Sequence, residues 1–362
     1  MNIVFRADAS INIGSGHIMR CLTLASYLAE KGHQCYFVCR MLGGNLIDMI
    51  IQKGFPAYAL QEDKEPMINE QRLFHSHWLG VSQQTDIQET IAVLKNNKIT
   101  PDWLIIDHYA LDEEWEKLFS SVFKNTKIFV IDDLADRNHQ CDLLLDQNLD
   151  ASSMKYVSRV IPTRTQVLVG VEFALLRPEF AIWRGKSLAY RKAPKLKEIL
   201  LNLGGIDKDN ITGQVLQILS KTELAESLHI TVVMGKTAPH INKIKELSQA
   251  LSLNIDVVVN VSNMAELMAK SDLAIGAAGS TSWERCCLGL PTLLFVLAEN
   301  QKKVANILEY NGIAKIVDVD NIANVLQNLT ACDLQKMSEK ASSLIDGKGA
   351  LRVIRKIENI YG

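Results

Sequence analysis

The sequence has no excess of charge of either sign and no apolar run long enough to cross a membrane. Its 362 residues include 39 Lys and Arg and 41 Asp and Glu, which gives a formal net charge of −2. This balance argues against a nucleic-acid-binding surface, which usually shows as a basic domain or stripe. The longest apolar runs, such as 291–298, are far shorter than the ~20 residues that a membrane span needs. We therefore expect neither nucleic acid nor a membrane among the partners of this protein.

The residue patterns of several common sites are also missing. None of the seven cysteines lies in a Cys-x-x-Cys pair, and no spacing of His and Cys matches a zinc site. There is no Gly-x-Ser-x-Gly elbow and no P-loop. The first residues place Arg6 and Asp8 where a secretory signal would need an uninterrupted apolar stretch. These absences predict a protein of the reducing cytoplasm that uses no metal and no cofactor.

The sequence does contain a regular alternation of short apolar strands and amphipathic helices. Strands are predicted at 2–5, 34–39, 103–106, 127–131 and 143–145, and again at 198–203, 229–234, 255–259, 273–275 and 292–296. Such alternation gives parallel sheets with helices on both faces. The predicted fold is therefore α/β, with two doubly wound, Rossmann-like domains that face a cleft. Because open α/β sheets bind ligands beyond the carboxyl ends of their strands, that cleft is the expected site.

The domain boundaries follow from changes in composition. We predict an N-terminal domain over 1–180 and a C-terminal domain over 196–345. The linker between them is placed at 181–195, in a segment that is rich in charge and has little periodicity. Residues 346–362 read as a helical tail after a glycine break.

The first candidate site is the glycine loop that follows the first strand. Gly14 and Gly16 permit positive φ and close approach of a ligand to the backbone, and the helix that begins at about His17 presents free N–H groups to an anion. The loop is not a dinucleotide fingerprint, because Met19 stands where the third glycine would be. A His at the mouth of a helix suggests a general base that works close to neutral pH. A His that merely caps or packs the helix is the alternative.

The second candidate site directly follows the strand at 103–106. Asp107, His108 and Tyr109 stand where α/β sites form. Tyr109 could donate a hydrogen bond to a substrate oxygen, since its hydroxyl stays protonated. Asp107 is equally well explained as a turn or helix cap.

Further candidates lie in the second half of the chain. Gly205 belongs to a glycine turn after a strand, and small residues with the hydroxyls of Ser280 and Thr281 could bind a phosphate. Glu284, one turn on, could accept two hydrogen bonds from a ribose diol, although a first-turn Glu also complements a helix dipole. Asn300 again puts a polar side chain after a strand.

Several of these blocks occur together in one known family. The run FRADASINIGSGHIMRCLTLA resembles the opening of the UDP-2,4-diacetamido-2,4,6-trideoxy-β-L-altropyranose hydrolases of pseudaminic acid biosynthesis. The blocks LIIDHY, IDDLADR, GVEFALLRPEF, LNLGG and GAAGSTSWERCCLGLP are similar to later parts of that family in the same order. The similar blocks lie within residues 1–315. The last of them is shared with nucleotide-sugar glycosyltransferases of the peptidoglycan type.

This resemblance implies a glycosyltransferase-B architecture and hydrolysis of a UDP-linked 2,4-diacetamido-2,4,6-trideoxy hexose at its anomeric carbon. The reaction would invert configuration, need no metal, and release the free sugar and UDP for flagellin glycosylation or surface polysaccharide. By position, His17 corresponds to the base and Tyr109 to an active-site tyrosine. Residues in blocks that line the nucleotide-sugar site are Arg177, Ser280, Thr281, Glu284 and Asn300. The loop from Gly279 to Glu284 is one residue shorter than in the related transferases. The resemblance therefore supports the phosphate-binding role of Ser280 and Thr281 less directly than the role of Glu284.

Two other functions fit the same features. A glycosyltransferase would use His17 to deprotonate an acceptor hydroxyl and not water. A catalytically inactive sensor that only binds a nucleotide sugar would give His17 no chemical role. We expect a small-molecule UDP-sugar as the partner, and a monomer.

Overall fold

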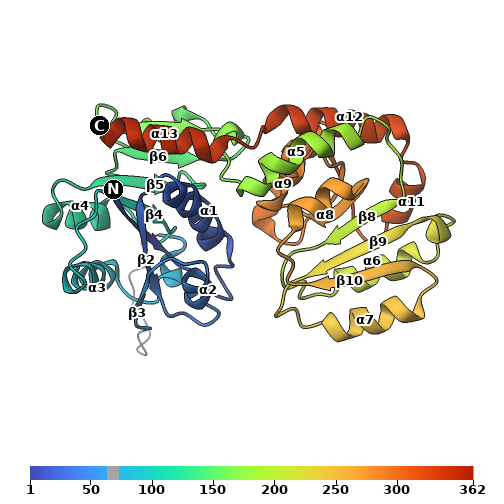
Figure 1. Ribbon diagram of the computed structural model, residues 1–362, viewed down its shortest axis with the longest axis horizontal. Coiled ribbons are helices and arrows are strands. Elements are labelled where there is room, and N and C mark those ends of the chain that lie inside the picture. Colours follow the sequence, from blue (N-terminus) through green and yellow to red (C-terminus); the bar gives the residue numbers. More distant parts are fainter. Residues whose placement is uncertain (63–72, 362) are drawn as a thin grey trace. The chain divides into compact units, whose positions relative to one another are not determined.

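The computed structural model describes residues 1–62 and 73–361, apart from the side chain of residue 300 (Figure 1). The chain divides into two compact units. The first comprises Met1–Leu176 and Lys348–Gly362, and the second comprises Arg177–Gly347.

The first unit is built on a parallel sheet of seven strands. The strands are β1 (Asn2–Ala7), β2 (Gln34–Arg40), β3 (Ala57–Leu60), β4 (Trp103–Asp107), β5 (Lys127–Ile131), β6 (Leu143–Asp146) and β7 (Gln166–Val169), in the spatial order β3-β2-β1-β4-β5-β6-β7. The helices are α1 (Gly16–Glu30), α2 (Ile47–Gln52), α3 (Gln83–Asn96), α4 (Glu113–Val122) and α13 (Gly349–Tyr361).

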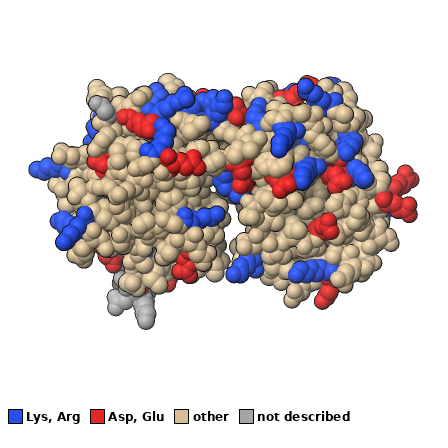
Figure 2. Space-filling view, in the orientation of Figure 1, with Lys and Arg blue, Asp and Glu red and all other residues tan. Residues whose placement is uncertain are grey.

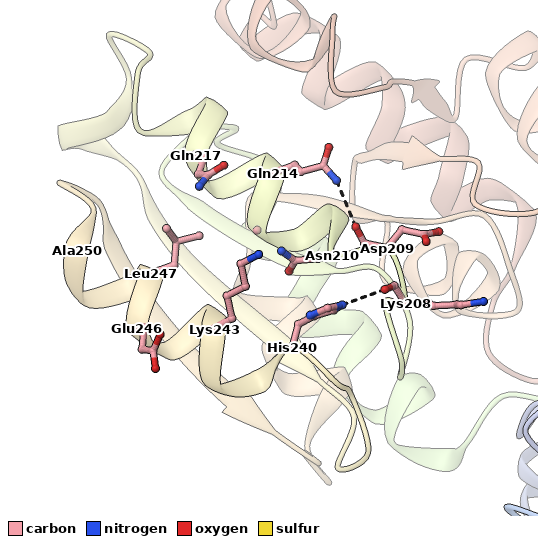
Figure 3. A pocket seen from close by; sticks show the side chains of 11 residues that line it. Lys208, Asp209, Asn210, Gln214, Gln217, His240, Lys243, Glu246, Leu247 and Ala250 are labelled. Carbon is pink, nitrogen blue, oxygen red and sulfur yellow. Dashed lines mark hydrogen bonds between the residues drawn. The ribbon is translucent and has the colours of Figure 1, made fainter.

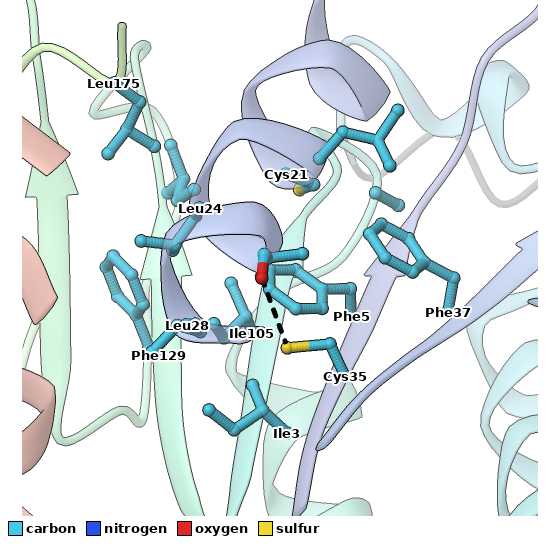
Figure 4. Close-up of a cluster of buried hydrophobic side chains, with 14 of the residues drawn as sticks. Ile3, Phe5, Cys21, Leu24, Leu28, Cys35, Phe37, Ile105, Phe129 and Leu175 are labelled. Atoms are coloured by element: carbon cyan, nitrogen blue, oxygen red, sulfur yellow. Dashed lines mark hydrogen bonds between the residues drawn. The ribbon is translucent and has the colours of Figure 1, made fainter. Parts of the chain in front are cut away.

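Helices cover both faces of this sheet because the strands are apolar on both sides. Ile3 and Phe5 of β1 point into a core shared with α1, α2 and α13, part of which is drawn in Figure 4. Val4, between them, points into the opposite core, which is shared with α3 and α4. Side chains alternate across a strand, so a strand that is apolar at every position must be buried on both faces. The near-continuous apolar strands in the sequence are explained by this arrangement.

The second unit has a parallel sheet of six strands. They are β8 (Glu198–Asn202), β9 (His229–Met234), β10 (Asn254–Val259), β11 (Leu273–Ala277), β12 (Thr292–Phe295) and β13 (Ala314–Ile316), in the order β10-β9-β8-β11-β12-β13. The helices are α5 (Pro178–Tyr190), α6 (Ile211–Leu219), α7 (Ile241–Ala250), α8 (Met264–Lys270), α9 (Thr281–Cys287), α10 (Lys302–Tyr310), α11 (Ile322–Gln327) and α12 (Ala331–Leu344).

The predicted class, two Rossmann-like α/β domains, is confirmed by these two sheets. Each of the ten predicted strands is present to within two residues at either end. The sequence did not predict β3, β7 and β13. These strands have three or four residues each and occupy sheet edges, where a short segment carries little periodicity.

The structure divides the chain differently from the predicted linker at 181–195. Most of that segment is helix α5, which begins at Pro178 and belongs to the second unit. The two arginines of the segment bind carbonyl oxygens: Arg184 donates to those of Cys287 and Ser342, and Arg191 donates to those of Gly289 and Met268. The units divide at 176/177 and 347/348 instead of 180/181 and 345/346.

The tail predicted at 346–362 contains helix α13, red in Figure 1, which returns to the first unit. Val353, Ile354 and Ile357 join the core that also contains residues of α1. The close approach at Gly349, where an added Cβ would lie 2.2 Å from the carbonyl oxygen of Ala174, fixes the start of this helix.

Each sheet has one point where the strand order reverses. The chain runs outward from β1 through β2 to β3 and then returns to place β4 on the other side of β1. In the second unit, β11 returns to the free side of β8 in the same way. Ligands of open α/β sheets bind outside the carboxyl ends of the strands at such a switch point. The ends of β1 and β4, and those of β8 and β11, are therefore the places to examine.

The charged side chains of the two signs lie among one another on the face seen in Figure 2. Across the described ranges, no helix is long and apolar enough to cross a membrane. The same residues include no group of three or more His, Cys, Asp or Glu that could hold a metal ion.

Candidate active site

The loop before α1 is a tight turn that places His17 at the switch point of the first sheet. The N–H of Gly14 donates to the carbonyl oxygen of Ser10 at 2.8 Å, and Gly14 has φ +80°. The Ser10 hydroxyl accepts from the backbone N–H of Ile13 at 3.0 Å. The expected positive φ thus occurs at Gly14 but not at Gly16, which is the first residue of α1.

His17 and Asp107 form a buried pair at this point. Nδ1 of His17 lies 2.6 Å from Oδ1 of Asp107, and the two residues are 7% and 0% exposed. Asp107 is the last residue of β4, in register with Ala7 at the end of the neighbouring β1. The parallel register therefore brings together two residues that are 90 positions apart in the chain.

The charge state of Asp107 decides which nitrogen of His17 is free. Burial alone would raise the pKa of Asp107, but Arg20 and then His17 hold that pKa well below its usual range. An ionised carboxylate only accepts hydrogen bonds, so Nδ1 of His17 must carry the proton in this pair. In the neutral imidazole, Nε2 then has the lone pair, and no described residue is hydrogen-bonded to it. His17 is thus arranged to accept a proton at Nε2.

Arg20, one turn after His17 on α1, locks the pair in place. Its guanidinium donates twice to Asp107, at 2.5 and 2.6 Å, and once to Asp133, at 2.5 Å. Asp133 follows β5, the strand beside β4. The bidentate geometry fixes the carboxylate that orients the imidazole.

The Tyr109 hydroxyl, which the sequence predicts as a donor to a substrate oxygen, already donates to a carboxylate of the protein. The acceptor is Oδ2 of Asp133, at 2.7 Å. Burial and then Asp133 raise the pKa of Tyr109 well above its usual value. The ring meets His17 edge-on, with 4.6 Å between centroids. In this state Tyr109 forms a wall beside the imidazole.

The structure adds an aromatic residue that the sequence did not single out. Trp78 lies in a short 3₁₀ turn (Ser76–Trp78), stacks on Tyr109 at 5.7 Å and lies 6.3 Å from His17. His75 contacts the same indole at 4.2 Å. No pattern in the sequence around residues 75–78 indicates this contact.

Buried charges hold the turn that carries Asp133. Asp132 accepts from two backbone N–H groups of the following turn and from Arg137 at 2.9 Å. His139 lies 3.7 Å from Asp132 and 2.7 Å from Glu116. Burial lowers the pKa of His139, but Glu116 and Asp132 together raise that pKa to about 9. The positively charged imidazolium ties α4 to the loop after β5.

In the second unit, the structure brings together two predicted residues that lie 107 positions apart. Nη2 of Arg177 is 3.5 Å from Oε1 of Glu284, and Nη1 is 3.1 Å from Glu179. Burial raises the pKa of Glu284, and Arg177 opposes that rise. Arg177 therefore takes part in a structural ion pair within this unit. Whether either residue also binds a nucleotide stays a prediction.

The remaining predicted residues follow three neighbouring strands of the second sheet. Gly205 follows β8, Ser280 and Thr281 follow β11, and Asn300 follows β12. Positive φ occurs at Gly204 (+95°) and not at Gly205, whose carbonyl oxygen accepts from the N–H of Gly235 at 3.1 Å. Ser280 is exposed and makes no side-chain cap bond, while the Thr281 hydroxyl lies 3.4 Å from Arg285. The backbone of Asn300 lies in a 3₁₀ turn after β12, and its side chain is outside the described part of the chain.

A separate cavity of about 610 Å³ lies in the second unit between α6 and α7 (Figure 3). Lys208, Asn210, His240 and Lys243 are among its lining residues, and Nε2 of His240 lies 2.9 Å from the carbonyl oxygen of Lys208. None of the predicted site residues lines this cavity.

Several known proteins are similar to this chain. The chain is 29% identical over 316 residues to the UDP-2,4-diacetamido-2,4,6-trideoxy-β-L-altropyranose hydrolase of Campylobacter jejuni, which covers 86% of this chain and 97% of that protein. This chain is a relative of that hydrolase. The resemblance of the sequence blocks is confirmed by this match, which extends over most of both proteins.

Three further matches complete the comparison, and the structural one agrees with a glycosyltransferase-B fold. Residues 200–355 match the family described as Glycosyltransferase family 28 C-terminal domain. The crystal structure of MurG from Acinetobacter baumannii aligns with a TM-score of 0.67 at 15% identity, over 99% of each chain. The Bacillus subtilis spore coat polysaccharide biosynthesis protein SpsG is 22% identical over 372 residues, covering 100% of this chain and 99% of that protein.

Proposed function

We propose that this protein hydrolyses a UDP-linked 2,4-diacetamido-2,4,6-trideoxy hexose, breaking the bond between the anomeric carbon and the diphosphate oxygen. The observation that carries the proposal is the buried His17–Asp107 pair at the switch point of the first sheet. The activity for which the Campylobacter jejuni relative is named supports the choice of substrate.

In the proposed reaction, Nε2 of His17 takes a proton from a water molecule as the water oxygen attacks the anomeric carbon. The C–O bond to UDP breaks, UDP leaves with the electron pair, and the sugar is released with inverted configuration. Asp107 stabilises the imidazolium that forms, because its carboxylate already accepts from Nδ1 at 2.6 Å. The proton then passes from His17 to solvent or product.

The second unit is proposed to hold the UDP. Glu284 is assigned to the ribose hydroxyls, and Ser280 and Thr281 are assigned to the diphosphate. Arg177 would contact a phosphate or an acetamido oxygen, and Gly205 and Asn300 would complete the set. The proposed reaction uses no metal ion. We assign the reaction to pseudaminic acid biosynthesis.

We predict that Glu284→Ala weakens UDP binding by about 1.5–3 kcal/mol, the usual range for hydrogen bonds to a charged acceptor. Calorimetric titration with UDP measures the effect. Glu179→Ala is the matched control, because Glu179 also binds Arg177 but is not assigned to the ribose. Equal UDP affinities in the wild type and Glu284→Ala would reduce Glu284 to a partner of Arg177.

The second candidate function is a UDP-sugar glycosyltransferase. The match of residues 200–355 to a glycosyltransferase family favours it, and His17 would then deprotonate an acceptor hydroxyl. Incubation with a panel of UDP-sugars and no acceptor separates the two. The hydrolase releases UDP and free sugar under these conditions, with or without excess chelator. A strict need for an acceptor would favour the transferase, and activity lost to chelator and restored by a divalent ion would overturn the metal-free mechanism.

A further inference from the structure

One cation of the second unit is buried against a loop and not against a carboxylate. Arg285, on α9, is 3% exposed. Its Nη2 donates to the carbonyl oxygen of Ala277 at 2.8 Å and to the Ser282 hydroxyl at 3.0 Å, and its Nη1 lies 3.4 Å from the Thr281 hydroxyl. Among the described residues, no carboxylate forms a salt bridge with it, because the neighbouring Glu284 pairs with Arg177 instead. Burial lowers the pKa of Arg285 to about 10.

The position of the guanidinium is built into the sheet. A Cβ added at Gly276 would lie 2.4 Å from Nη1 of Arg285 and 3.2 Å from the carbonyl oxygen of Asn202. Gly276 and Asn202 are paired in register near the carboxyl ends of β11 and β8. The absence of a side chain at Gly276 therefore makes room for a charge at the switch point of the second sheet.

A buried charge that no carboxylate contacts directly is costly, and the nearby Glu284 compensates for only part of the burial, since the pKa of Arg285 stays lowered. Hydrogen bonds to carbonyl and hydroxyl oxygens offset part of this cost, yet Nε of Arg285 has no partner among the described residues. An anion bound to the loop would add the negative charge that Glu284 supplies only in part.

The hydrogen bonds of Arg285 also fix the shape and polarity of the loop. The side chain joins Ala277, where the loop begins, to Ser282, where it ends. Because the Thr281 hydroxyl accepts from Arg285, its own O–H is left to donate. The exposed tip at Ser280 lies within the clamped segment. A loop of small residues, held from beneath by a cation and presenting a hydroxyl donor, suits a phosphate.

We propose that Arg285 is the positioning residue of a diphosphate-binding loop over 277–281, which it clamps from beneath and to which it supplies positive charge. The role rests on the proposed function, since the diphosphate is that of UDP. It also explains how a leaving diphosphate could be stabilised with no metal ion.

The test compares ligands that differ in phosphate content. Affinities for uridine, UMP and UDP are measured for the wild type, Arg285→Lys, Arg285→Met and Thr281→Val. Arg285→Met should lower the affinity for UDP about tenfold or more, as expected for lost charge-assisted contacts, and change that for uridine less than about twofold. Arg285→Lys keeps the charge but not the clamp and should show an intermediate loss. Thr281→Val should weaken UDP binding in the wild type and have no further effect in Arg285→Met.

Arg191→Lys is the matched control. Arg191 is also buried in this unit, donates only to carbonyl oxygens, those of Gly289 and Met268, and has a pKa lowered by burial to about 10. Its replacement should lower the melting temperature without changing the ratio of UDP to uridine affinity.

The outcomes test the role of Arg285 separately from the proposed function. If Arg285→Met does not fold, Arg285→Lys and Thr281→Val still test the proposal. Equal losses for uridine and UDP in Arg285→Lys would overturn the role of Arg285 and leave the proposed hydrolysis standing. An unchanged UDP affinity in Thr281→Val would overturn both the clamped loop and the assignment of Thr281 to the diphosphate. A wild type that binds none of the three ligands would overturn both.

Discussion

Replacing His17 by asparagine is expected to leave the fold and UDP binding intact and to lower turnover by about 10²–10⁴-fold, the usual contribution of a general base. Asparagine can still donate a hydrogen bond to Asp107, so the buried carboxylate keeps a partner. It has no basic nitrogen at the position of Nε2, so the attacking water is no longer deprotonated. Turnover of the UDP-sugar and UDP affinity should be measured on the same preparation.

His77→Asn provides the matched control for that experiment. His77 lies in the 3₁₀ turn beside Trp78, is exposed, and makes no contact with the His17–Asp107 pair. Its replacement should change turnover little. Near-full turnover in His17→Asn would remove His17 from the mechanism, whatever the control shows.

Asp107→Asn should have an effect of the same order and also destabilise the first unit. The amide can present its NH₂ group to Nδ1, which favours the tautomer with the proton on Nε2 and blocks the base. The corresponding change in the Ser-His-Asp triad lowers turnover by about 10⁴-fold. In addition, Arg20 loses the charge to which it makes two bonds, and breaking a buried pair costs about 3–5 kcal/mol. Turnover and the free energy of unfolding should therefore both fall.

Asp133→Asn separates these two effects. Asp133 binds Arg20 and Tyr109 but not His17. The change should therefore affect stability more than turnover. An Asp107→Asn protein that is destabilised yet turns over at the wild-type rate when folded would show that Asp107 only anchors Arg20.

Most of the fold could be predicted because the buried parallel strands are apolar at nearly every position. Strands such as 103–106 and 229–234 stand out for this reason, and helices between them complete the α/β pattern. Helix α5 could not be predicted in the same way, since its Arg184 is held by carbonyl oxygens that distant segments supply. The return of α13 to the first unit likewise depends on packing against α1 and has no local signal.

The site could be predicted residue by residue but not as a set of contacts. His17 and Asp107 each stood out, the first by its place at a helix start and the second by following a strand. Their pairing depends on the strand order, which puts β4 beside β1. Arg20 and Arg285 lay within recognised blocks, yet only the structure shows what each guanidinium binds. The hydrogen bond from Tyr109 to Asp133 shows why a donor predicted from the sequence can already be engaged.

The most direct test of the account is the position of cleavage, read from turnover in H₂¹⁸O. If His17 activates a water molecule toward the anomeric carbon, the new oxygen belongs to the sugar and the released UDP contains no label. UDP is the decisive product for mass spectrometry, because the free sugar can exchange its anomeric oxygen with water and needs an incubated control. Unlabelled UDP with labelled sugar is the predicted result. Label in the phosphate of UDP would show attack on phosphorus and would contradict the mechanism built on His17 and Asp107.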